Sequence, residues 1–185
     1  MRMKPNTVVS VAVTPETEEM VAEYLSTRNL GQRASGGNGS PEQQKHGMWG
    51  QMTVSHWLTD EYPDLMASSD GFDGGVDITY LGMSIDIKTM GRNVPGDKPW
   101  YVNNLNASQT TNIYKADTYI FCSYNKKKHV VDIVGWLPKQ CLELKSDYFE
   151  AGTDRERDDG TFTHCRTNMF EIPNSDLLDI SYLKQ

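Results

Sequence analysis

Two aspartates and a lysine stand out in the stretch GGVDITYLGMSIDIKTMGR, residues 74–92. Asp77 and Asp86 lie in a run that otherwise alternates like strand sequence, and Lys88 follows two residues after the second acid. Carboxylate oxygens bind hard cations such as Mg²⁺. A bound cation polarises a phosphoryl oxygen and helps to generate hydroxide, while an amine orients water or stabilises developing charge. These residue types are therefore those of a hydrolytic metal centre.

A β-hairpin would position these residues, with Gly82 as its natural turn residue. A loop of Leu81 and Gly82 places Tyr80 opposite Met83 and makes one face of the hairpin wholly apolar, as a buried face requires. That face consists of Val76, Ile78, Tyr80, Met83, Ile85 and Ile87.

The other face of this hairpin places Asp77 directly opposite Asp86, with Lys88 one pleat further along the second strand. Like charges opposed across a strand pair are destabilising, so the register predicts a cation between the two acids. The alternative is a hairpin whose second face is simply solvated. A change of one residue in loop length would also exchange the two faces.

Helices and further strands surround this hairpin in the sequence. Residues 14–29 predict a helix with Thr14 as its N-cap, and residues 48–63 predict a second, after a flexible Gly- and Ser-rich loop over about 31–47. Residues 117–124 and 129–137 read as a second strand pair. Short helices are expected near 107–114 and 138–145. This order predicts one α/β or α+β domain over residues 1–185, with a central mixed sheet flanked by helices.

The pattern from Asp77 to Lys88 resembles the PD-(D/E)XK nuclease superfamily, whose fold is shared with many restriction endonucleases. Asp86, Ile87 and Lys88 match the (D/E)-x-K element, Asp77 matches the earlier acid, and Val76 replaces the proline. The resemblance implies a restriction endonuclease-like fold. It also implies that Asp77, Asp86 and the Ile87 carbonyl hold Mg²⁺, or Mn²⁺ in its place, with Lys88 at the attacking water.

The similarity extends over most of residues 21–183 and is strongest to small phage-type members. Its further motifs are Arg28-Asn29 with the Gly-rich loop, GQMTVSHWL, DGGVD, ADTYIFC and DIVGW. One departure concerns Gln51, because the family often carries a glutamate at this helix position. Glutamine can hydrogen-bond a metal-bound water but adds no charge, which leaves open whether one metal or two would bind.

Basic residues are the candidates for contacts with DNA phosphates. Arg92 and Lys98 flank the proposed site, Arg33 lies in the Gly-rich loop, and Lys126, Lys127 and Lys128 form a local cluster that could equally be a solubilising turn. The formal net charge of −7 weakens a DNA-binding interpretation without excluding it. The three cysteines show no CxxC spacing, which argues against both a disulfide framework and a structural zinc site.

The sequence thus predicts a Mg²⁺-dependent deoxyribonuclease, foremost an endonuclease, which acts on DNA and has no membrane partner. An exonuclease or a Holliday-junction resolvase of the same fold is the alternative among enzymes. A catalytically weakened nuclease-like protein that binds DNA or another partner is the alternative outside them. A homodimer is plausible. The expected location is the cytoplasm, that of the host if a phage encodes the protein.

Overall fold

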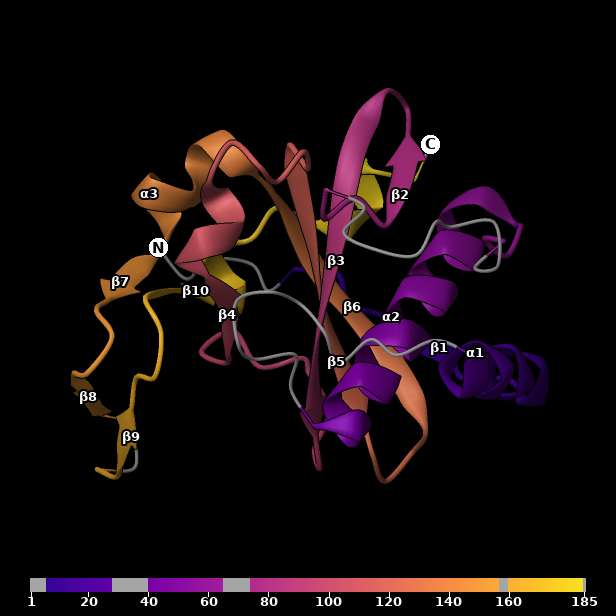
Figure 1. The fold of residues 1–185 in the computed structure, drawn as a ribbon, viewed down its shortest axis with the longest axis horizontal. Helices are drawn as coiled ribbons and strands as arrows, with labels where there is room; N and C mark the ends of the chain where they lie inside the picture. Colours follow the sequence, from indigo (N-terminus) through magenta and orange to yellow (C-terminus); the bar gives the residue numbers. More distant parts are fainter. Residues whose placement is uncertain (1–5, 28–39, 65–73, 157–159, 185) are drawn as a thin grey trace.

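The computed structural model describes residues 6–27, 40–64, 74–156 and 160–184 (Figure 1). Within these ranges the fold is mixed α+β, with a curled mixed sheet at its centre and three α-helices. None of the helices in these ranges is long and apolar enough to cross a membrane.

The central sheet has five strands. Their spatial order is β1 (Val9–Ala12), β6 (Val130–Pro138), β5 (Thr118–Asn125), β3 (Met83–Arg92) and β2 (Ile78–Tyr80). β3 and β5 run parallel, whereas the other neighbours are antiparallel. Every residue of β5 is buried, so the middle of the sheet is covered on both faces.

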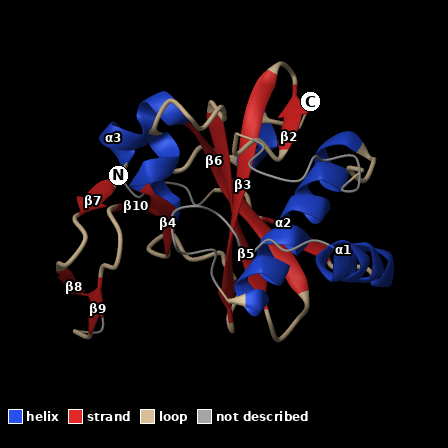
Figure 2. Ribbon diagram, viewed as in Figure 1, coloured by secondary structure: helices blue, strands red, loops and turns tan. Residues whose placement is uncertain are grey.

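Helices cover one face of this sheet and a second sheet covers the other (Figure 2). α1 (Pro15–Thr27) and α2 (Pro41–Thr59) lie on the first side. The other side carries α3 (Leu142–Lys145) and the three-stranded sheet of β4 (Val102–Asn106), β10 (Met169–Pro173) and β7 (Asp147–Phe149). A two-stranded ribbon, β8 (Asp154–Glu156) and β9 (Phe162–His164), extends from this side. Short 3-10 turns are η2 (Ala107–Thr110), η3 (Lys139–Cys141), η4 (Asn174–Asp176) and η5 (Ile180–Tyr182).

The two faces of β3 belong to two different hydrophobic cores. Ile85 and Ile87 pack into the core that α1 and α2 complete. Asp86 pairs in register with Tyr119 of β5, and Tyr119 belongs to the core beneath β4 and β10. Because side chains alternate along a strand, Asp86 and Lys88 project to the side away from α2.

The start of α2 differs from the sequence-based prediction. The helix begins at Pro41, so residues 41–47, predicted as the end of a loop, are helical, and residues 31–39 lie outside the described residues. The cause is a capping box, in which the Ser40 hydroxyl accepts from the Gln43 N–H and the Gln43 side chain accepts from the Ser40 N–H. Pro41 follows at the first helical position, which suits its fixed φ.

The remaining predicted elements are largely confirmed. Thr14 caps α1, with its hydroxyl 3.1 Å from the Thr17 amide nitrogen. The strand pair is present as β5 and β6, and residues 138–145 contain η3 and α3. Near 107–114, where a short helix was expected, the structure has only the 3-10 turn η2. The strand β1 was not predicted.

The predicted register of the hairpin is confirmed through Ile78↔Ile85, Thr79↔Ser84 and Tyr80↔Met83. Leu81 and Gly82 form its turn, with φ values of 49° and 77°. Two consecutive positive φ angles are typical of a type I′ turn, which matches the twist of the flanking strands. Leucine is poorly suited to this conformation because its Cβ crowds the backbone.

Replacing Leu81 with Asn should therefore stabilise the fold by about 1 kcal/mol, because asparagine adopts the left-handed conformation more readily. Urea denaturation would measure the change. Leu144→Asn is the matched control, since Leu144 is also an exposed leucine but lies in α3. An equal or smaller stability for Leu81→Asn than for the unmodified protein would contradict the assignment of strain to this turn.

Candidate metal centre

Asp86 and Lys88 form an ion pair on the β3 face that points away from α2. The Lys88 ammonium lies 2.7 Å from Asp86 Oδ1, and the Asp86 side chain is only 4% exposed. The other carboxylate oxygen, Asp86 Oδ2, is buried and has no hydrogen-bond partner. A buried carboxylate with one bare oxygen is energetically unfavourable, so this oxygen is suited to a cation.

Asp77 approaches β3 by a different route from the one predicted. It lies just before β2, outside the ladder, and its N–H donates to the Ile85 carbonyl at 2.9 Å. The predicted direct opposition of Asp77 and Asp86 is therefore not part of the observed strand register. Instead, Asp77 Oδ2 accepts a hydrogen bond from the Ile87 N–H at 2.7 Å, a position that a backbone carbonyl of β2 would otherwise fill.

The Ile87 carbonyl points toward this same edge of β3. The N–H and C=O of one strand residue project to the same side, as the paired exchange of bonds in an antiparallel ladder requires. The Asp77 carboxylate is bound to the Ile87 N–H, so it lies on the edge that also presents the Ile87 carbonyl. The edge of β3 at Ile87, the residue after Asp86, thus presents both the Asp77 carboxylate and the Ile87 carbonyl oxygen.

Two consecutive glycines set the path of the chain into Asp77. Gly74 and Gly75 have φ values of 80° and 71°, which side chains other than glycine rarely adopt. The Gly74 carbonyl accepts from the Lys115 N–H at 2.7 Å. A Cβ on Gly75 would lie 2.6 Å from the Tyr114 ring, so the close contact also requires glycine. The Gly-Gly pair in the sequence is the signal for this bend.

Tyr119, which was not among the predicted site residues, lies beside Asp86 on the neighbouring strand β5. Burial raises the pKa of Tyr119, and the charges of Asp86 and Tyr114 raise it further. The Tyr119 phenol therefore stays protonated, and its hydroxyl donates to the Gln109 carbonyl at 3.1 Å. This bond attaches η2 to β5 beside Asp86. Residue spacing in the sequence does not predict such a contact.

The donor set fits a magnesium ion with few protein ligands. The described part of the chain contains no group of three or more His, Cys, Asp or Glu side chains arranged to hold a metal. Mg²⁺ usually keeps several waters and binds through one or two carboxylates, so Asp77 and Asp86 with the Ile87 carbonyl are sufficient. The bare Asp86 Oδ2 is the observation that supports this fit.

Gln51 lies on α2 and is half-buried. The neighbouring Gly50 packs directly on β3, because a Cβ there would overlap the Thr89 hydroxyl. This contact is on the opposite face of β3 from Asp86. Within the described residues no hydrogen bond or ion pair joins Gln51 to Asp77 or Asp86, and its role at the site remains a prediction.

Arg92 and Lys98, the predicted phosphate contacts, differ in their availability. The Arg92 Nη2 donates to the Val102 carbonyl at 2.6 Å, and its guanidinium lies 4.9 Å from the centre of the Tyr101 ring. Burial lowers the pKa of Arg92. Lys98 is exposed and makes a long ion pair of 3.7 Å with Asp97. Lys98 is therefore the more accessible of the two cations.

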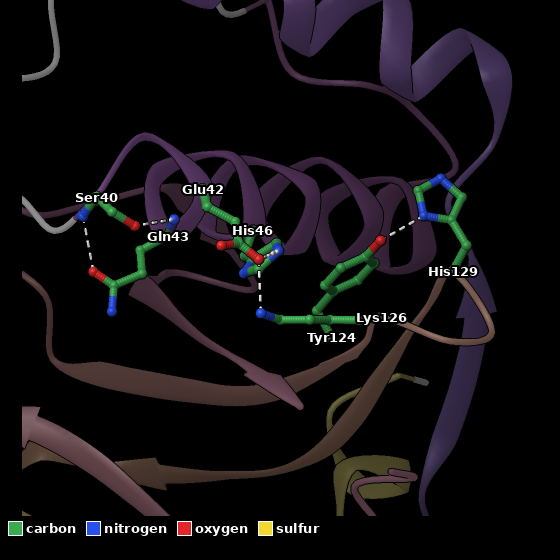
Figure 3. A network of polar contacts seen from close by, with 7 residues as sticks. All are labelled: Ser40, Glu42, Gln43, His46, Tyr124, Lys126 and His129. Carbon is green, nitrogen blue, oxygen red and sulfur yellow. Dashed lines mark hydrogen bonds and ion pairs between the residues drawn. The ribbon is translucent and has the colours of Figure 1, made fainter. Parts of the chain in front are cut away.

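The lysine cluster lies at the turn between β5 and β6, near Arg92 at the end of β3 and six residues from Asp86 along that strand. Figure 3 shows Lys126 of this cluster. The Lys126 backbone N–H donates to the Arg92 carbonyl, and its ammonium pairs with Glu42 at 2.7 Å. The charge of Lys126 is thus partly compensated, whereas Lys127 and Lys128 are exposed and pair with no acid in the described part of the chain. Arg33 lies outside the described residues.

The same view shows how α2 is attached to this turn. Glu42 lies between Lys126 and His46, and the Tyr124 hydroxyl is 2.6 Å from His129 Nδ1 (Figure 3). Burial lowers the pKa of His46, and Lys126 lowers it further. His46 is therefore neutral at pH 7. These contacts attach α2 to the β5–β6 turn, which is a structural role.

Comparison with known proteins yields no match: no family model, curated protein or solved structure matches the chain.

Mg²⁺ should stabilise the protein through Asp86. A concentration about tenfold above the dissociation constant should add about 1.4 kcal/mol. This corresponds to a rise of about 3–6 °C in melting temperature for a chain of this size. Differential scanning fluorimetry with and without Mg²⁺ would measure the rise. It should vanish in Asp86→Asn and persist in Glu143→Gln, an exposed acid on α3. An unchanged rise in Asp86→Asn would place the cation elsewhere.

Proposed function

We propose that this protein is a metal-dependent DNA nuclease with a restriction endonuclease-like fold, foremost an endonuclease. One observation carries the proposal: the bare oxygen of buried Asp86 lies on the strand whose edge holds the Asp77 carboxylate, with Lys88 paired to the other Asp86 oxygen. Two acids and a lysine arranged in this way match what phosphodiester hydrolysis requires.

Lys88 is suited to a direct role in the reaction. Its side chain is 21% exposed, so it is not fully enclosed by the protein, and Asp86 Oδ1 fixes the position of its ammonium group. A cation held in this way can orient an attacking water or stabilise charge that develops on a phosphoryl oxygen. Mg²⁺, when bound, would polarise the phosphodiester and lower the pKa of a water. Asp77 and Asp86 would hold that ion, and the Ile87 carbonyl would add a third oxygen.

The position of the hairpin supports an endonuclease. β2 is an edge strand of the central sheet, so Asp77 and Asp86 lie near the rim. An internal phosphodiester can approach a rim from the side without a free DNA end being threaded past the site. Exonucleases and junction resolvases of the same fold remain alternatives that substrate choice distinguishes.

A second candidate function is DNA binding without appreciable turnover. The described residues supply two carboxylates rather than three, and Gln51 stands where the superfamily that the sequence resembles often has a glutamate. The net charge of −7 further means that binding would depend on local cations such as Lys98, Lys127 and Lys128. A dimer that brings two such sites to one duplex is consistent with either function.

Lys88→Ala should lower Mg²⁺-dependent DNA cleavage by about a hundredfold or more, because it removes a positioned cation. The assay compares closed circular, linear and branched DNA with Mg²⁺ or Mn²⁺. Lys145→Ala, an exposed lysine in α3, is the matched control and should cut normally. Each variant is assayed well below its own melting temperature.

Cutting of closed circles supports an endonuclease, products from free ends alone support an exonuclease, and selective cutting of branched DNA supports a resolvase. If no DNA is cut with either metal, or if Lys88→Ala cuts as fast as the unmodified protein, the nuclease proposal fails.

Gln51→Glu should raise Mg²⁺-dependent cleavage by about tenfold if this helix position contacts the metal's water ligands. Gln44→Glu, on the same helix and also half-buried, provides the control for a general effect of charge. Initial rates on the preferred substrate measure the difference. Equal rates for both variants would show that position 51 takes no part in the reaction.

A further inference from the structure

The loop that follows β3, residues 93–101, displays a tryptophan to solvent. Trp100 is 60% exposed, whereas Trp49 in the core is only 6% exposed. Exposing an indole ring forgoes the gain in free energy that burial would provide. Single exposed aromatic side chains are common, and Phe162 and Tyr182 are others in this protein, so the surroundings of Trp100 decide what it can bind.

Hydrogen bonds hold this loop in one conformation. The Asn174 side chain donates to the Gly96 and Lys98 carbonyls at 2.8 and 2.9 Å, and its backbone N–H donates to the Tyr101 carbonyl. The Ser175 N–H donates to the Pro99 carbonyl at 3.0 Å. These bonds surround Trp100 on both sides in the sequence.

The other end of the loop is anchored to the central sheet. Asp132 of β6 is buried and accepts from the Gly96 N–H at 2.8 Å. Pro95 and Pro99 restrict the backbone further. Rigidity of this kind lowers the entropy lost when a ligand binds, so the loop is preorganised to present its exposed ring.

Cations accompany the ring. The Arg92 guanidinium lies over the Tyr101 ring, and Tyr101 makes an edge contact with Trp100 at 6.3 Å between ring centroids. Lys98 is exposed two residues before Trp100. An aromatic face beside positive charge is complementary to a base and its phosphate.

We propose that Trp100 stacks on an unpaired base, and that this loop binds single-stranded DNA or the unpaired part of a branched substrate. The proposal rests on the proposed nuclease function and specifies its substrate class. Arg92 is six residues beyond Asp86 on β3 and on the same face, a separation of about 20 Å along the strand. One DNA strand could therefore contact the loop and the metal centre together. A paired base offers its face only to its neighbours in the duplex, so a duplex would gain little from Trp100.

The test measures DNA binding separately from cutting. A fluorescent oligothymidylate and its duplex with oligoadenylate are titrated with protein in EDTA, which prevents metal-dependent cleavage. Trp100→Ala should bind the single strand about tenfold more weakly or worse and should leave duplex binding nearly unchanged. Trp100→Phe, which keeps an aromatic face, should retain most of the affinity. Tyr182→Ala removes another exposed aromatic residue, 75% exposed in η5, and should have no effect.

Each outcome decides the proposal. Equal affinity of Trp100→Ala and the unmodified protein for the single strand overturns it, as does an equal loss for single strand and duplex. Absence of DNA binding by the unmodified protein also overturns it and directs attention to a protein partner for Trp100. If Trp100→Ala is poorly folded by circular dichroism, Trp100→Leu replaces it, since leucine keeps apolar contact with Tyr101 without an aromatic face.

The two proposals fail in different ways. Single-strand binding that depends on Trp100, without any cleavage when Mg²⁺ is added, would support this loop while refuting the nuclease. Normal cleavage by the unmodified protein, together with unchanged single-strand binding by Trp100→Ala, would support the nuclease and refute the role of this loop.

Discussion

A buried negative charge on β3, the strand between β5 and the edge strand β2, governs the organisation of this protein. Asp86 is 3% exposed and lies next to β5, the strand that is covered on both faces. A carboxylate in such a place needs compensation, because transfer of an unpaired charge from water to a protein interior is strongly unfavourable. Lys88 provides that compensation at one oxygen. The bare second oxygen then makes the site receptive to a cation, and the surrounding elements can be understood by how they maintain this arrangement.

One face of β3 packs into the hydrophobic core, and the other face carries the side chains of the candidate site. Ile85 and Ile87 fix the strand against α1 and α2 through a hydrophobic core. Since side chains alternate along a strand, this packing forces Asp86 and Lys88 to the opposite side. The Gly74–Gly75 bend then brings the Asp77 carboxylate to the backbone of Ile87, where it replaces a ladder hydrogen bond. A shift of β3 by one residue would exchange both faces, so the core also protects the register of the site.

The face that carries Asp86 has different features at its two ends. Near Asp86 lie Tyr119 and the turn η2, joined by the hydrogen bond from the Tyr119 hydroxyl. Toward Arg92 lie the loop held by Asn174 and the exposed Trp100. Cations are distributed along this route rather than concentrated in one patch, which is how an acidic chain of net charge −7 can still present local positive charge to a polyanion.

The hairpin, its turn and its apolar face could all be predicted from local sequence, because period-two alternation and a glycine turn are local signals. Local sequence also singled out Asp77, Asp86 and Lys88. The types and spacing of these three residues can be recognised without knowledge of the fold. The three-dimensional fold was needed to show that Asp77 lies outside the ladder and binds the Ile87 amide, because this depends on the close approach of Gly75 to Tyr114, a residue far along the chain. The fold was likewise needed to show that Arg92 packs on Tyr101 while Trp100 stays exposed. Burial and long-range contacts arise from packing between distant segments, so local periodicity in the sequence does not predict them.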